Sequence, residues 1–217
     1  MTASFVAENL ACRRGERIVV RGVSFALAAG DALLLRGANG SGKSTLLRVL
    51  AALIPPAQGR VLADGVDVAE DPERHRAQLR YLGHLDALKP DLTLRENVAA
   101  AASLAGADGS RVDAALEAFT LAPMADRPAR FLSQGQRRRA ALARVLAAPA
   151  TLWLLDEPTL ALDAAASQRL EQAIASHRDG GGIAVIATHA GLTAAGARTL
   201  TLAEKGSDPA GSDPVPA

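Results

Sequence analysis

The chain has little cysteine and almost no net charge. Cys12 is the single cysteine among its 217 residues, so an internal disulfide is excluded, and we expect the thiol to pack as a small apolar group in a reducing compartment. Lys and Arg number 24 against 23 Asp and Glu, a net charge of +1. Because this balance provides no overall field to attract nucleic acid or anionic lipid, we expect no nucleic-acid partner.

Long apolar runs and a leader-like start are also missing. The most apolar stretch, residues 98–107, is too short and too rich in alanine to span a bilayer. Glu8 and Asn9 occupy positions where a signal peptide needs apolar residues. A function at a membrane therefore requires another subunit to carry this chain there. A length of 217 residues suits one compact α/β unit with an inserted subdomain.

The order of apolar runs and turns predicts a parallel sheet wrapped by helices, preceded by a β-rich quarter. Expected strands cover 4–10, 18–27, 32–35, 59–67, 151–155 and 183–187, and expected helices cover 43–53 and 164–177. Residues 72–146 have helical spacing and are interpreted as a mostly helical insertion. Residues 204–217 contain Gly-Ser-Asp-Pro twice and are expected to form a disordered tail.

A glycine-rich loop follows the expected strand 32–35 and opens the next helix. It matches the pattern G-x-x-x-x-G-K-[ST] with Gly37, Ala38, Asn39, Gly40, Ser41, Gly42, Lys43, Ser44 and Thr45. Such a loop directs backbone N–H groups at a β-phosphate, while Lys43 neutralises phosphate oxygens and the Ser44 hydroxyl is placed for Mg²⁺. An ordinary glycine-rich turn is the alternative, but the strand, loop and helix setting favours nucleotide binding.

Ionisable side chains follow two of the expected parallel strands. Asp156 and Glu157 end the apolar run 152–157, and we assign Asp156 to a metal ion and Glu157 to a water molecule. A solvated strand terminus is the alternative. His189 follows the expected strand 183–187 at the same sheet edge, where it is either a hydrogen-bond donor to the γ-phosphate or a structural histidine.

The string Leu132-Ser133-Gln134-Gly135-Gln136 opens another expected helix. Its hydroxyl and N–H groups predict a second anion site, although a simple helix cap uses the same residue types. Three arginines follow at 137–139. They are interpreted as a partly solvated face that helps to hold the geometry near the phosphates.

In this order the motifs resemble those of ABC-transporter ATPase subunits over residues 4–202. The stretch 37–45 resembles their Walker A loop, 132–136 their LSGGQ signature with Gln134 in place of the first glycine, and 152–157 their Walker B strand. Ala161-Leu162-Asp163 resembles their D-loop, and His189 their switch histidine. The resemblance implies an α/β P-loop NTPase domain at 1–203, with an N-terminal antiparallel β subdomain and a helical subdomain at about 86–148. It also implies hydrolysis of ATP with Mg²⁺, with Lys43, Glu157 and His189 as catalytic residues.

The same resemblance implies partners. In that family two copies face head to tail, so Ser133, Gly135 and Gln136 of one copy belong to the ATP site of the other. Asp163, in the D-loop, is also expected among the nucleotide-binding residues. An integral membrane permease subunit docks on the helical subdomain. The chain is then a peripheral membrane protein on the cytoplasmic face of a bacterial inner membrane.

Two positions depart from the general ABC pattern. His84 stands where the Q-loop glutamine is expected, and it is either a metal ligand or a loop residue with no metal role. Arg14 stands where an aromatic residue stacks on adenine, and its guanidinium can also stack on a base.

These departures, with the segment Tyr81-Leu82-Gly83-His84, resemble the ATP-binding subunits of the cytochrome c maturation exporter, the CcmA family. The resemblance implies ATP hydrolysis coupled to haem export or to release of a haem-loaded chaperone. The alternatives are the ATPase of another small exporter, a soluble ABC ATPase, and a nucleotide switch that has lost hydrolysis.

Overall fold

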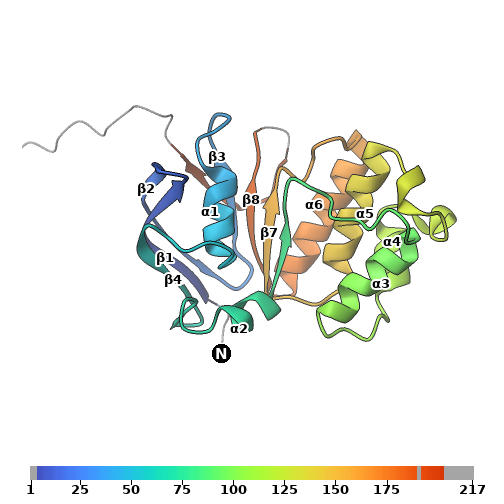
Figure 1. Cartoon of the computed structure of the whole chain (residues 1–217), viewed down its shortest axis with the longest axis horizontal. Helices are drawn as coiled ribbons and strands as arrows, with labels where there is room; N and C mark the ends of the chain where they lie inside the picture. The colour runs from blue at the N-terminus through green and yellow to red at the C-terminus, as the bar shows by residue number, and fades with distance from the viewer. Residues whose placement is uncertain (1–3, 190–191, 203–217) are drawn as a thin grey trace, which may run out of the picture.

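An antiparallel sheet forms the N-terminal part of the chain. The computed structural model describes residues 4–189 and 192–202, so the tail expected at 204–217 lies outside the described residues. The sheet has the strand order β2-β1-β4-β5 (Figure 1). Its strands are β1 (Ser4–Arg14), β2 (Arg17–Ala28), β4 (Gln58–Ala63) and β5 (Val66–Asp67). The prediction of a β-rich first quarter is confirmed.

A parallel sheet forms the centre of the molecule. Its strand order is β6-β7-β8-β3-β9, and every pair of neighbours is parallel. The strands are β6 (Leu79–Leu82), β7 (Leu152–Asp156), β8 (Ile183–Ala187), β3 (Ala32–Arg36) and β9 (Arg198–Thr201). Every residue of β7 and β8 is buried, as expected for parallel strands that are covered on both faces.

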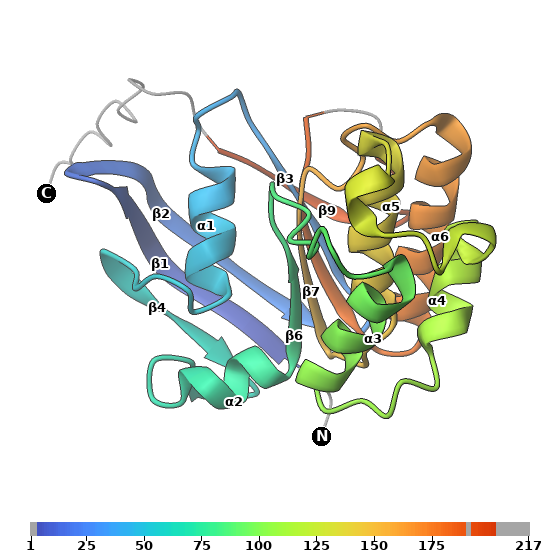
Figure 2. The ribbon, with the colours of Figure 1, turned by 45° about the vertical axis from the view of Figure 1, so that its right-hand side comes forward.

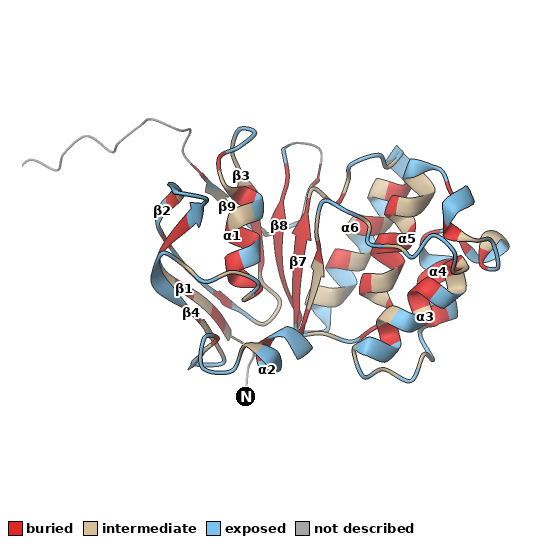
Figure 3. Ribbon diagram, in the orientation of Figure 1, coloured by how far each residue is buried: buried red, intermediate tan, exposed pale blue. Residues whose placement is uncertain are grey.

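Alternate side chains of the parallel sheet belong to two separate cores. Trp153 and Leu155 point to one face, where they pack with the helices that follow β6. Leu152 and Leu154 point to the other face, where they pack with the first helix and the antiparallel sheet. Because side chains alternate along a strand, one apolar run supplies both cores. Figure 3 colours β7 and β8 as buried.

The helices divide between the two faces of the parallel sheet. Helix α1 (Lys43–Leu50) lies between the two sheets, whereas α3, α4, α5 and α6 cover the opposite face (Figures 1 and 2). The remaining bounds are α2 (Pro72–Ala77), α3 (Leu94–Leu104), α4 (Val112–Ala118), α5 (Gln134–Leu146) and α6 (Ala164–Asp179), with 3-10 turns at Ala122–Met124 and Ala129–Phe131. None of the helices in the described part of the chain is long and apolar enough to cross a bilayer.

Two strands of the parallel sheet differ from the sequence-based expectation. The interpretation of 72–146 as mostly helical is wrong for β6, which pairs with β7. Strand β9, which pairs with β3, was not among the expected strands. Both strands have only four residues, and each is placed by hydrogen bonds to a strand more than 60 residues away in sequence. Apolar periodicity within a short window does not contain that information.

Candidate functional site

The glycine-rich loop lies between β3 and the N-terminus of α1, as predicted. Gly42 has φ +100°, a backbone conformation that favours glycine, and a Cβ at this position would lie 2.5 Å from Val20 Cγ2. Both the backbone conformation and the lack of space for a side chain therefore require glycine here. Gly42 is also the N-cap of α1 and provides no side-chain cap. The first N–H groups of α1 are therefore left for an anion.

Lys43 is bound back onto the loop that precedes it. Its Nζ donates to Gly37 O at 2.8 Å and to Ala38 O at 3.2 Å, and the residue is only 6% exposed. These bonds keep a buried ammonium group at the mouth of the loop. A phosphate there would meet both this charge and the free N–H groups of the helix.

The two carboxylates at the end of β7 differ in environment. Asp156 is 2% exposed, and its Oδ1 has no hydrogen-bond partner among the described residues. Glu157 has φ +46°, in the left-handed region that a non-glycine residue rarely adopts, and its N–H donates to Ala187 O at 2.9 Å. The turn at Glu157 therefore directs the second carboxylate away from the strand and toward Lys43, whose Nζ lies 4.0 Å from Glu157 Oε1.

His189 joins Lys43 and Glu157. Its Nε2 lies 3.3 Å from Lys43 Nζ and 3.2 Å from Glu157 Oε1. Its backbone N–H donates to Glu157 Oε2 at 3.3 Å. Three side chains from the ends of β7 and β8 and the start of α1 therefore meet at one point, as expected for the carboxyl edge of a parallel sheet.

A hollow of about 390 Å³ contains this cluster, and we call it the Lys43 hollow. Its lining also includes Arg14, from the end of β1, and His84, just after β6. The two positions that depart from the general ABC pattern are thus brought to the same site. The full lining is Arg14, Val19, Asn39, Gly40, Gly42, Lys43, Ser44, Thr45, His84, Glu157, Leu160 and His189.

The string 132–136 lies at the start of α5 and contributes no residue to that lining. Ser133 and Gln136 form a capping box: the Ser133 hydroxyl accepts from Gln136 N at 3.2 Å, and Gln136 Oε1 accepts from Ser133 N at 2.8 Å. A Cβ on Gly135 would lie 2.9 Å from Ala161 O. The start of α5 is therefore packed against the loop that contains Asp163.

Asp163 has a structural bond within its own chain. It is the N-cap of α6, and its Oδ1 accepts from Ala166 N at 2.7 Å. Like the residues of the string 132–136, it is absent from the lining of the Lys43 hollow.

The sequence singled out Arg138 only as one of the three arginines at 137–139, without a role of its own. The interpretation of 137–139 as a partly solvated face is wrong for this residue, because Arg138 is 3% exposed and bonds to Gly83, Asp86, Asp156 and Glu157. One signal was available: Arg138 precedes the buried Leu142 by four positions and Val145 by seven, so it belongs to the apolar face of α5.

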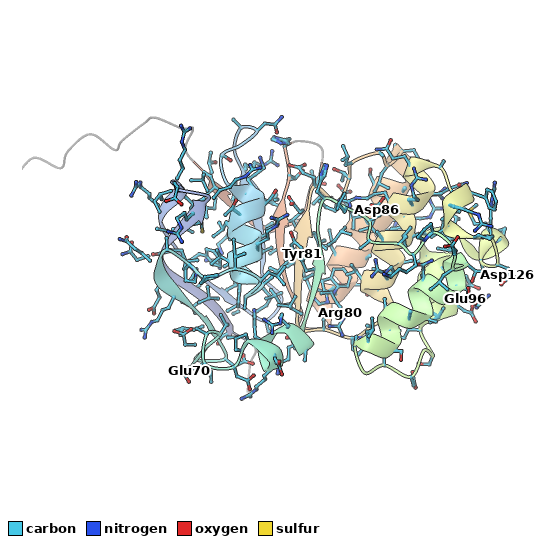
Figure 4. All side chains as sticks on the ribbon, viewed as in Figure 1. Glu70, Arg80, Tyr81, Asp86, Glu96 and Asp126 are labelled. Carbon is cyan, nitrogen blue, oxygen red and sulfur yellow. The ribbon has the colours of Figure 1, made fainter. Side chains whose placement is uncertain are left out.

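A second hollow, of about 440 Å³, lies between the parallel sheet and the helical layer. Arg48, Arg76, Arg80 and Arg144 line it, together with Tyr81 and the segment 82–87, and we call it the arginine groove. Figure 4 labels Arg80, Tyr81 and Asp86 along it. His84 lines both the arginine groove and the Lys43 hollow, which places the two side by side.

Burial shifts the pKa of two histidines and of the cysteine. Burial lowers the pKa of His177, whose ring stacks on Trp153 with centroids 4.1 Å apart, and burial also lowers the pKa of His75. Burial raises the pKa of Cys12 to about 11, which confirms this thiol as a packed, unreactive group.

Comparison with known proteins gives one consistent result. The family described as ABC transporter matches residues 20–160. The chain is 58% identical, over 95% of its length and 89% of the relative, to a protein of Rhodospirillum rubrum named cytochrome c biogenesis ATP-binding export protein CcmA.

Solved structures share the fold. An ABC transporter ATP-binding protein from Pyrococcus furiosus, described as putative, has a TM-score of 0.81 at 22% identity, covering 92% of this chain and 97% of that one. An ATP-binding cassette in a dimeric post-hydrolysis state, bound to ADP and Pi, has a TM-score of 0.75 at 27% identity, covering 86% of this chain and 88% of that one.

Proposed function

Because this chain belongs to the ABC transporter family, in the branch of the CcmA export proteins, we propose that it is the ATP-hydrolysing subunit of a transporter for cytochrome c biogenesis. The observation that carries the proposal is the meeting of Lys43, Glu157 and His189 in one hollow at the N-terminus of α1. That arrangement suits a nucleotide triphosphate whose γ-phosphate lies at the cluster.

Each member of the cluster has a distinct part in hydrolysis. Glu157 orients a water molecule for attack on the γ-phosphorus, and the new P–O bond forms as the bond to the β-phosphate oxygen breaks. The proton of the water leaves with inorganic phosphate. Lys43 stabilises the charge on the phosphate oxygens, and His189 Nε2, 3.2 Å from Glu157, donates to the γ-phosphate. Binding of ATP replaces the present contacts among these three side chains.

The residues at the hollow fit a magnesium ion carried with the nucleotide. A buried carboxylate oxygen without a hydrogen-bond partner is costly, and Asp156 Oδ1 is such an atom among the described residues. Asp156 and the Ser44 hydroxyl would hold the ion, with His84 as a further candidate on the lining. When bound, the ion neutralises phosphate charge.

Arg14 is the candidate contact for the adenine base of the nucleotide. Arg14 and Val19 lie on neighbouring strands at the rim of the Lys43 hollow, so the Arg14 guanidinium can stack on the base in place of an aromatic ring.

A second copy of the chain completes the site. Ser133, Gly135, Gln136 and Asp163 lie outside the lining of their own hollow, which supports contact with the ATP of another copy. The dimeric ADP-bound cassette with the same fold agrees with such an assembly. In a head-to-tail dimer, the N-terminus of α5 would add its N–H groups to the exposed side of the phosphates.

The arginine groove supports docking of an integral membrane subunit. Its four arginines favour an acidic segment, and Leu85 and Leu104, 79% and 90% exposed, provide apolar contacts for one side of a helix. This arrangement would hold the chain as a peripheral protein on the cytoplasmic face of the inner membrane. His84, shared by groove and hollow, connects docking with the nucleotide site. Hydrolysis would then drive haem export or release of a haem-loaded chaperone.

The direct test compares ATP hydrolysis by the full chain alone with hydrolysis by its complex with the co-purified membrane subunit. We expect higher turnover in the complex and loss of turnover in Lys43→Ala, and cells with Lys43→Ala should lack covalent haem in c-type cytochromes. Normal cytochrome c maturation with Lys43→Ala would contradict the proposed role. Recovery of ribosomes or DNA with the chain, and of no membrane protein, would favour a soluble ABC ATPase.

A further inference from the structure

Arg138 connects three segments that are far apart in sequence. It lies in α5, four positions after Gln134, the first residue of the helix, and is 3% exposed. Its Nη1 donates to Gly83 O at 3.1 Å and to Asp86 Oδ1 at 3.2 Å. Its Nη2 donates to Asp156 O and to Glu157 O, each at 2.7 Å. A single buried guanidinium on α5 thus bonds to the segment 83–86 and to the end of β7.

The two short bonds hold the backbone that carries both catalytic-site carboxylates. Glu157 has φ +46°, a conformation that an ordinary residue keeps only when its surroundings enforce it. Arg138 provides such enforcement, because the carbonyl oxygens on both sides of the Glu157 α-carbon, Asp156 O and Glu157 O, accept from one nitrogen. A change at Arg138 would let the Glu157 carboxylate move from its place beside Lys43 and His189.

The fork shape of arginine matters here. One guanidinium nitrogen, Nη2, donates to Asp156 O at the end of β7, and the other, Nη1, donates to Asp86 Oδ1. Because the guanidinium is planar and rigid, these bonds fix the spacing between α5, β7 and the segment 83–86. Arg144, further along α5, donates to Asp86 O at 2.8 Å and Ala87 O at 2.9 Å. The segment 83–87 lines the arginine groove, so α5 holds this segment at two points next to the proposed docking surface.

We propose that Arg138 is a positioning residue for hydrolysis, which sets Glu157 against the γ-phosphate and ties that position to the segment 83–86. The inference rests on the proposed role of Glu157 as the residue that orients water. Arg138 is absent from the lining of the Lys43 hollow. Its substitution should therefore slow the chemical step while nucleotide binding is retained.

The test uses the full chain in complex with its membrane subunit and four variants. Arg138→Lys keeps the charge but loses the two-pronged guanidinium. Arg139→Lys is the matched control because the Arg139 side chain donates to Phe119 O and Thr120 Oγ1, just after α4. Asp86→Asn removes the ionic partner and leaves the guanidinium in place. Glu157→Gln reports on the proposed function itself. The measurements are affinity for a fluorescent ATP analogue, single-turnover hydrolysis, melting temperature and the fraction of ATP-bound dimer.

Arg138→Lys should hydrolyse bound ATP about 30- to 100-fold more slowly, with affinity changed less than about threefold, because small misplacements of a catalytic group cost rate rather than binding. Like Glu157→Gln, it should accumulate the ATP-bound dimer, which a merely structural defect would not cause. Arg139→Lys should hydrolyse ATP at the unmodified rate.

The outcomes separate this proposal from the proposed function. Near-normal single-turnover hydrolysis in Arg138→Lys, with Glu157→Gln inactive, would overturn the role of Arg138 alone. Near-normal hydrolysis in Glu157→Gln would overturn the role of Glu157 in the mechanism. If Arg138→Lys does not fold, Asp86→Asn decides: a slower single turnover at unchanged affinity supports the proposal, and an unchanged rate contradicts it.

Discussion

At the scale of single residues, the proposed chemistry depends on contacts among three side chains from different elements. Lys43, Glu157 and His189 lie within 4.0 Å of one another in pairs. Their types were predicted from the sequence, because each follows a recognisable strand or loop. The contacts among the three side chains depend on the pairing of β7 with β8 and of β8 with β3. This pairing could not be predicted from local sequence patterns.

The first prediction concerns Glu157. Glu157→Gln keeps the size of the side chain but removes the carboxylate that orients water, so the chain should bind ATP normally and hydrolyse it about 10²- to 10⁴-fold more slowly. Initial rates of phosphate release and a parallel binding titration check this. Glu117→Gln, on the exposed surface of α4, is the control. Phosphate release near the unmodified rate would remove Glu157 from the mechanism.

The second prediction concerns His177 and pH. Burial lowers the pKa of His177 in the folded chain, so below about pH 6.5 the unfolded chain binds a proton that the folded chain does not. The free energy of unfolding is therefore highest above the pKa that His177 has in the unfolded chain. As the pH falls below that pKa, the free energy of unfolding decreases by about 1.4 kcal/mol per pH unit for each such proton.

His177→Phe keeps a ring against Trp153 and removes this titration. Urea unfolding followed by the fluorescence of Trp153, the single tryptophan, should therefore show a shallower loss of stability between pH 7 and pH 5 in this variant. His75→Phe should reduce the slope for the same reason, since burial lowers the pKa of His75 as well. Equal slopes in all three proteins would contradict the assignment.

At the scale of elements, long buried runs were predictable and short edge strands were not. Strand β8 is apolar throughout, and β3 and β7 are apolar up to their last residues, Arg36 and Asp156, so their apolar runs identified them. Strand β6 contains Arg80 among four residues, and β9 has mostly exposed residues, so neither has a strong apolar pattern. Their strand conformation comes from pairing with β7 and β3.

The start of α5 carries the third prediction. A Cβ on Gly135 would lie 2.9 Å from Ala161 O, and the atom that must move belongs to the backbone. Gly135→Ala should therefore destabilise the chain by about 1–2 kcal/mol, because overpacking outweighs the better helix propensity of alanine. Gln134→Ala, at an exposed neighbouring position, should stay within about 0.5 kcal/mol. Thermal unfolding measures both, and equal stabilities would show that the loop at Ala161 yields freely.

At the scale of the whole molecule, the two helix starts that were predicted to bind phosphate do not line the same hollow. The loop 37–45 lines the Lys43 hollow, whereas the string 132–136 begins a helix in the layer on the other side of the parallel sheet. The sequence placed both motifs on helix N-termini. The fold places them on opposite sides of the parallel sheet, and this separation supports the proposal that a second copy completes the site.

Cross-linking between copies tests this central claim most directly. Chains with Asn39→Cys are mixed with chains with Ser133→Cys under mild oxidation, with and without ATP, and the buried Cys12 contributes no background. The account predicts a disulfide-linked dimer that forms in the mixture when ATP is present and in neither preparation alone. A mixture that gives no ATP-dependent dimer, or gives no more than each variant by itself, would contradict it.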